Sequence, residues 1–145
     1  RATKVTEKHV RKALHKIELD HITEVIKTLP LQSKILLLAM VREEREKKAS
    51  GLKPSMTTGE VYERYRQLSK KLKIESLTQR RIADLISELD MLGIITARVI
   101  SKGRYGRTRE IELSTPPNEI IKILQDDDTV NPLIIYGGRG QTRLI

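Results

Sequence analysis

The chain has 145 residues, of which 38% are hydrophobic, so it suits one domain with a real core, or one domain with an added helical segment. It has no cysteine, which excludes a disulfide framework and a thiolate metal site and permits a reducing cytosolic compartment. The longest apolar run, residues 35–41, is far too short to span a membrane, and the basic N-terminus lacks the apolar region of a signal peptide.

The net charge of +9 is unevenly distributed. Residues 1–115 contain 25 lysines and arginines against 15 acids, whereas residues 116–145 contain 3 against 4. A basic excess favours polyanions, because phosphates release condensed counterions when lysine and arginine bind them. Phenylalanine and tryptophan are absent, which disfavours stacking on single-stranded bases and makes duplex DNA the expected partner. A basic protein that binds no nucleic acid is the alternative at this point.

Two short helices are expected at the N-terminus. Val10, Ala13, Leu14 and Ile17 follow helical spacing within residues 5–19, and Asp20 offers a second N-cap before a helix that reaches Leu29. His9, His15 and His21 lie six residues apart, so each step turns about 240° around a helix and they cannot share a face as metal ligands would. No metal site is expected.

Pro30 suits the first turn of the next helix, residues 30–47. Its ILLLAMV run is apolar on nearly every face, which predicts a centrally buried helix. A mobile loop around Gly51 and Pro54 should follow. Thr57 and Glu60 have the spacing of a capping box and begin a helix over 58–72 with one apolar stripe.

The stretch from Leu77 to Leu113 predicts a helix followed by a hairpin. Leu77 can pack onto Ile82 as a hydrophobic staple, Thr78 is a good N-cap, and Gly93 is placed to end the helix 79–92. Two alternating segments, 94–100 and 109–113, flank a glycine-containing loop as strands would. The fold class is therefore mainly α with a small β-hairpin: a winged helix-turn-helix preceded by one or two extra helices.

Beyond the hairpin, a short helix is expected over 119–125 after Pro116 and Pro117. Residues 126–145 lack periodicity and are expected to form a largely disordered tail.

The helix 79–92 has the properties of a DNA recognition helix. Burying Ile82, Leu85 and Ile86 leaves Gln79, Arg80, Asp84, Ser87 and Met91 pointing outward, with Arg81 near the boundary. The start of such a helix can bond phosphates and base edges. The DNA-binding candidates here are Thr78, Gln79, Arg80 and Arg81. The alternative is that Arg80 pairs with Asp84 on a solvated face.

The hairpin tip indicates DNA binding more strongly than the helix 79–92 does. Lys102, Arg104, Arg107 and Arg109 lie close together with no acid among them, and they are expected to be unpaired. Arginine suits a narrow minor groove, and Tyr105 can pack on sugars. The alternative is a soluble tip whose charges protect an edge strand. Ile95, Ala97 and Val99 are expected to face the core.

No enzyme signature is present: the chain has neither a G-x-x-x-x-G-K-[ST] phosphate loop nor a G-x-S-x-G elbow. We expect no catalytic residue and no cofactor.

Several segments resemble one family, the C-terminal part of archaeal replication initiators of the origin-recognition-complex and cell-division-cycle type. The similarity covers residues 3–125 and is carried by Tyr62, Tyr65 and the segments VTEKHVRKALHKIELDHITEVIKTLPLQSKILLLAM and LTQRRIADLISELDMLGIITARVISKGRYGRTREIEL. The resemblance implies a winged-helix domain at 20–125 and, at 1–19, the remnant of a lid helix from a preceding AAA+ ATPase. ATP is expected only for that ATPase, because its nucleotide-binding motifs have no matching positions here.

The same resemblance implies a function and partners. The helix beginning at Thr78 would enter the major groove of origin DNA, and the wing around Arg104 and Arg107 the minor groove. Partners would be double-stranded origin DNA, the replicative helicase and other initiator subunits, with no membrane, in the cytoplasm at the nucleoid. Two alternatives stay open: a protein-interaction winged helix that docks the helicase or another initiator, and a stand-alone transcriptional regulator.

Overall fold

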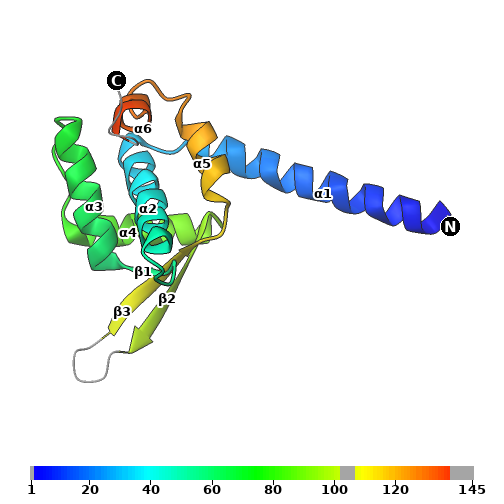
Figure 1. Cartoon of the computed structure of the whole chain (residues 1–145), viewed down its shortest axis with the longest axis horizontal. Coiled ribbons are helices and arrows are strands. Elements are labelled where there is room, and N and C mark those ends of the chain that lie inside the picture. The colour runs from blue at the N-terminus through cyan, green and yellow to red at the C-terminus, as the bar shows by residue number, and fades with distance from the viewer. Residues whose placement is uncertain (1, 102–106, 138–145) are drawn as a thin grey trace.

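The computed structural model describes residues 2–101 and 107–137, and it is a mainly helical domain with a small antiparallel sheet (Figure 1). A long helix, α1, projects from the body on one side, and the β2–β3 hairpin projects on another (Figure 1). No helix in the described ranges is long and apolar enough to cross a bilayer. The elements are α1 (Ala2–Lys27), α2 (Leu31–Ala49), β1 (Met56–Thr57), α3 (Thr58–Lys71), α4 (Gln79–Met91), β2 (Ile95–Ser101), β3 (Arg107–Leu113), α5 (Pro117–Leu124) and α6 (Asn131–Gly137).

The N-terminal segment is one continuous helix, so the prediction of two short helices is wrong. Asp20 does not act as an N-cap, because residues 2–27 contain no glycine or proline that would interrupt the helix there. The C-terminal end of α1 packs against α5 and buries Ile26 completely. The predicted apolar stripe lies further out, where Val10, Leu14 and Ile17 are 50%, 54% and 62% exposed.

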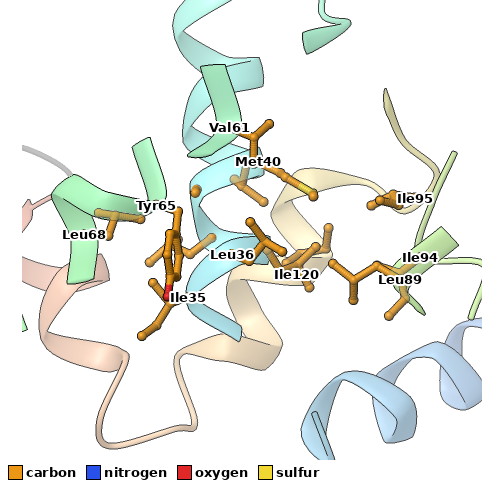
Figure 2. Close-up of a cluster of buried hydrophobic side chains, with 14 of the residues drawn as sticks. Ile35, Leu36, Met40, Val61, Tyr65, Leu68, Leu89, Ile94, Ile95 and Ile120 are labelled. Carbon is orange, nitrogen blue, oxygen red and sulfur yellow. The ribbon is translucent and has the colours of Figure 1, made fainter. Parts of the chain in front are cut away.

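The core forms around α2, as its apolar run predicts. Residues 35–41 are all fully buried, which a helix achieves only when other elements cover every side of it. Figure 2 shows Ile35, Leu36 and Met40 of α2 among Val61 and Tyr65 of α3, with Leu89, Ile95 and Ile120 beyond them. The centrally buried helix is therefore confirmed.

A capping box begins α3, as predicted. The Glu60 amide donates to Thr57 Oγ1 at 3.2 Å, and the Thr57 amide donates to Glu60 Oε1 at 2.9 Å. Burial opposes ionisation of Glu60, but the bonds from the Thr57 amide and from Lys47 outweigh it, so the pKa of this carboxyl is lowered.

The same segment holds a strand that was not predicted. Met56 and Thr57 form β1, which pairs with β3 opposite Ile111 and Glu110, giving the sheet order β1-β3-β2. Two residues are too few for an alternating pattern. The sheet nevertheless depends on β1, because Met56 is buried and closes the edge of β3.

Both predicted ends of α4 are confirmed. Thr78 Oγ1 accepts the Arg81 amide at 3.2 Å. At the other end Gly93 has φ +81°, its amide donates to Asp90 O at 3.0 Å, and the Ile94 amide donates to Leu89 O at 3.1 Å. This is a Schellman motif, and it leads the chain from α4 directly into β2.

The second hairpin strand begins two residues earlier than predicted, and the first is shifted by one residue, because pairing extends from Ile95 with Leu113 to Ser101 with Arg107. Ile95 and Ile111 are buried at the base of the hairpin. Val99 is 62% exposed, so its assignment to the core is wrong. It pairs with Arg109 towards the tip of the hairpin, four positions beyond the buried Ile95.

The C-terminal prediction is wrong for residues 126–137, which form a turn and α6 instead of a disordered tail. Val130 and Leu133 are buried. Lys34 Nζ lies 2.8 Å from Asp127 Oδ2, and the Arg42 guanidinium donates to the carbonyl of Leu133. These links to α2 order a segment whose own sequence has no period. Residues 138–145 lie outside the described part of the chain.

Two tyrosines of α3 hold the turn that leads into α4. The Tyr65 hydroxyl accepts the Leu77 amide at 2.9 Å and donates to Gln32 Oε1 of α2. The Tyr62 hydroxyl donates to the Leu77 carbonyl at 3.0 Å. Both polar groups of Leu77 are thus bonded to α3, directly before the N-cap of α4.

Replacing Tyr65 with Phe should destabilise the domain by about 1–3 kcal/mol, because the Leu77 amide and Gln32 lose their partner inside the fold. Urea unfolding followed by circular dichroism measures the change. The Tyr62→Phe variant is the matched control, and it should cost less because Tyr62 is only half-buried. Equal stability of Tyr65→Phe and the unchanged chain would contradict the role given to this hydroxyl.

Asp127 should make stability depend on pH. The hydrogen bond from Lys34, together with the Thr129 and Val130 amides, outweighs partial burial and lowers the pKa of Asp127 in the folded chain. The stabilisation is therefore fully present above the unfolded pKa of about 3.9 and is lost as pH falls through the lower folded value.

Asp127→Asn should accordingly lower the melting temperature at pH 7, and this difference should shrink as the pH is lowered below about 4. Thermal unfolding at a series of pH values measures it. Asp128→Asn is the control, since Asp128 is exposed and has no side-chain partner within the described ranges. A difference between Asp127→Asn and the unchanged chain that is independent of pH would refute the ion pair as its source.

Candidate nucleic-acid interface

The N-terminal turn of α4 presents a group of exposed polar and basic side chains. Thr78, Gln79, Arg80 and Arg81 are all exposed. Arg80 and Asp84 form no ion pair in the structure as described, so the charge-pair alternative is not realised. The cap at Thr78 fixes the start of the helix, and burial of Ile82 fixes its rotation. The four predicted residues therefore lie together at one exposed helix end.

Further along α4 the predicted outward face is only partly correct. Met91 is exposed, but Ser87 is half-buried and its hydroxyl donates to Ala83 O at 3.3 Å. Ser87 therefore does not extend the exposed face.

Arg109 has no acidic partner among the described residues, as predicted, but its guanidinium is not free in solvent. It is half-buried, and its Nη1 donates to the Ala83 carbonyl of α4 at 3.0 Å. The bond joins β3 to the middle of α4. The sequence could not reveal it, because an arginine shows no preference for one distant carbonyl over solvent.

Most of the other residues predicted at the basic hairpin tip lie outside the part of the chain that the structure describes. Lys102, Arg104 and Tyr105 lie outside the described residues, as does the side chain of Arg107, whose backbone begins β3. On the described part of the hairpin, Arg98 donates to Glu110 at 2.6 Å and lies 3.7 Å from Glu112. These two acids neutralise Arg98, which lies on the opposite side of β2 from its neighbour Val99.

A groove separates the start of α4 from the hairpin. One wall is the β1–α3 junction, another is Gln79, and the third is the hairpin. Its lining residues come from four separate segments: Thr57, Thr58, Gly59, Gln79, Val99, Thr108 and Arg109. Sequence reasoning found Gln79 and Arg109 but missed the threonines, because no local pattern brings positions 57–59 and 108 together.

Three further cations precede α4 and were also missed. Lys70, Lys71 and Lys73 are exposed at the end of α3 and in the turn, and within the described chain none of them pairs with an acid. The local excess of lysine over acid was visible in the sequence and could have identified them. They add positive charge to the segment that precedes Thr78 in the sequence.

The described residues hold no group of three or more His, Cys, Asp or Glu side chains that could bind a metal ion. The chemistry that the site offers is hydrogen bonding from amide, hydroxyl and guanidinium groups. These are the donors that bind phosphates and base edges.

Comparison with known proteins identifies the family. Residues 24–123 match the family model described as CDC6, C-terminal winged-helix domain. Curated ORC1-type DNA replication proteins of Pyrococcus horikoshii and Thermococcus kodakarensis are 58% and 53% identical over 99% of this chain, which spans 33% of each relative. The structure of the Aeropyrum pernix ORC1 protein in complex with DNA matches 87% of this chain and 31% of that one, with 42% identity and a TM-score of 0.78. The chain therefore belongs to the C-terminal winged-helix family of ORC1/CDC6-type DNA replication proteins.

Proposed function

We propose that this chain binds double-stranded DNA at replication origins as the DNA-reading domain of a replication initiator. In this proposal α4 enters the major groove and the wing reaches the adjacent minor groove. The observation that carries it is the exposed cluster of Gln79, Arg80 and Arg81 at the capped end of α4, free of acidic partners in the described chain. Surface cations without acidic partners remain available to phosphates and bases.

The relatives support the same proposal. The curated matches are DNA replication proteins, and the Aeropyrum pernix structure is of an ORC1 protein with DNA. This chain spans about a third of those relatives. We therefore also propose that a AAA+ ATPase with its own ATP site precedes it in the full protein, that residues 1–19 are the end of that ATPase lid, and that the chain itself is not catalytic.

The exposed stripe of α1 supports this division of the chain. Val10, Leu14 and Ile17 lie at helical spacing and are at least half exposed, whereas Ile26 near the end of the same helix is buried. An exposed apolar stripe of this kind offers a surface against which a preceding domain can pack. We further propose that the domain docks the replicative helicase or other initiator subunits. It would act in the cytoplasm, at the nucleoid.

Arg80→Gln should relax sequence preference, because an arginine bonded to a guanine edge contributes about 1–3 kcal/mol of discrimination. The measurement is a gel-shift series with origin duplex and scrambled duplex at two salt concentrations. Arg45→Gln is the control, because Arg45 donates to Asn118 of α5. Equal losses on origin and scrambled DNA would show that Arg80 contacts phosphates only.

Replacing Arg104 and Arg107 together with Ala should weaken duplex binding and flatten its salt dependence. Each phosphate contact that is lost should lower the slope of log K against log salt by about 0.9. Binding constants at four or more salt concentrations give the slope. Arg98→Ala is the control, since Glu110 and Glu112 already neutralise that side chain. An unchanged slope in the double variant would rule out the wing assignment.

A further inference from the structure

The first turn of α2 lacks the features that usually stabilise the start of a helix. Its N-cap is Pro30, which makes no side-chain hydrogen bond, and the turn contains no acidic residue. It contains Lys34 instead, a cation near the positive end of the helix dipole, where a positive charge is unfavourable. A negative charge brought from elsewhere in the fold would therefore stabilise this turn.

Asp127 brings such a charge from the C-terminal segment. Its Oδ2 lies 2.8 Å from Lys34 Nζ, and the Lys34 and Asp127 side chains are only 13% and 22% exposed, so solvent screens the pair weakly. Its other oxygen, Oδ1, accepts the Thr129 amide at 2.8 Å and the Val130 amide at 3.3 Å. The carboxylate is thus held in place by its own turn, which leads into α6 beside α2 (Figure 1).

The same turn of α2 also reaches the start of α4. Gln32 lies two positions before Lys34, and its side-chain oxygen accepts the Tyr65 hydroxyl, while its Nε2 lies 3.5 Å from the carbonyl oxygen of Glu75. The Tyr65 hydroxyl in turn accepts the Leu77 amide at 2.9 Å. If the turn frays, Gln32 moves and the segment directly before the N-cap of α4 loses these partners.

We propose that Asp127 is a positioning residue for the DNA-reading end of α4, and that it acts through the first turn of α2. The carboxylate holds Lys34 and the turn, the turn holds Gln32, and Gln32 holds residues 75–77, which set where α4 begins. The effect on DNA rests on the proposed function, whereas the effect on the start of α4 does not. Asp127 lies beyond residues 24–123, which match the family model, so family membership alone does not account for this link.

Amide hydrogen exchange followed by NMR tests the link, because a local opening and a global unfolding accelerate different sets of amides. The Lys34 amide, bonded to the Pro30 carbonyl, reports on the first turn of α2, and the Leu77 amide reports on the start of α4. The reference is the Ile94 amide, which is bonded to the Leu89 carbonyl at the other end of α4.

The variants are Asp127→Asn, Lys34→Gln and the two combined. Asparagine keeps an oxygen for the Thr129 and Val130 amides, so Asp127→Asn removes the charge pair and preserves the turn before α6. Asp128→Asn is the matched control, because it removes the same charge one position away from a side chain that has no partner within the described ranges. Circular dichroism verifies that each variant is folded.

We expect Asp127→Asn to accelerate exchange of the Lys34 and Leu77 amides by about threefold or more relative to Ile94, because the turn opens without unfolding of the domain. In the Lys34→Gln background the same change should have little effect, since no cation is left to hold. Asp128→Asn should leave all three amides unchanged. Equal acceleration at all three amides in Asp127→Asn would show a purely global loss of stability and overturn the proposal, as would an unchanged Leu77 amide.

DNA binding gives the second readout, with a duplex selected from a random-sequence pool by the unchanged chain. At a temperature where every variant is folded, Asp127→Asn should lower the preference for this duplex over a scrambled one by about threefold, because base reading needs a fixed helix start and phosphate attraction does not. The salt dependence should not change, since no phosphate contact is lost. Full preference in Asp127→Asn would contradict the positioning role. Failure of the unchanged chain to enrich any duplex would instead refute the proposed function, and the exchange rates would still decide the link to α4.

Discussion

The start of α4 is held by one buried hydroxyl. Tyr65 is completely buried, and its oxygen joins the Leu77 amide to Gln32, so α2, α3 and the start of α4 meet at a single atom. The preceding turn requires a strained residue, because Lys73 has φ 58°, a conformation that costs a non-glycine residue about 1–3 kcal/mol. The Lys73 and Ile74 amides donate to Lys70 O at 3.0 Å and Ser69 O at 2.9 Å, which helps to offset that cost. The direction of α4 is thus set by the Tyr65 hydroxyl and the backbone bonds of the turn, independently of the exposed side chains that are proposed to contact DNA.

Local signals made most of the fold predictable. The caps at Thr57, Thr78 and Gly93 act within four residues of themselves, and the apolar run of α2 reports its burial directly. The predictions that failed share one cause, which is contact between elements that are distant in the sequence. Strand β1 exists because β3 lies beside it, and α6 because Lys34 and Arg42 hold its segment against α2. Val99 has the position of a core residue in the alternating pattern of β2, but it lies far enough along the hairpin to be exposed.

The candidate site likewise contains some residues that the sequence could predict and others that it could not. Gln79, Arg80 and Arg81 could be predicted, because the cap and the apolar face of α4 together determine which side chains are exposed. The role of Arg109 could not be predicted, since its partner Ala83 lies 26 positions away in another element. Thr58 and Thr108 carry no local signal either. Residues that act through their position on one helix are therefore visible in a sequence, whereas a surface made by several elements needs the fold.

Several attachments fix the hairpin relative to α4. The Schellman motif at Gly93 joins the end of α4 to β2 without an intervening loop, and Arg109 ties β3 back to Ala83 in the middle of α4. The pairing of β1 with β3 and the burial of Ile95 and Ile111 also hold the base of the hairpin, so the separation between α4 and the hairpin is restricted. These attachments set that separation in the free domain, so binding of one ligand to both elements would cost little free energy for ordering them. The spacing between α4 and the hairpin, which the proposed function matches to two adjacent DNA grooves, is thereby fixed by strand pairing, core packing and one side chain to backbone hydrogen bond.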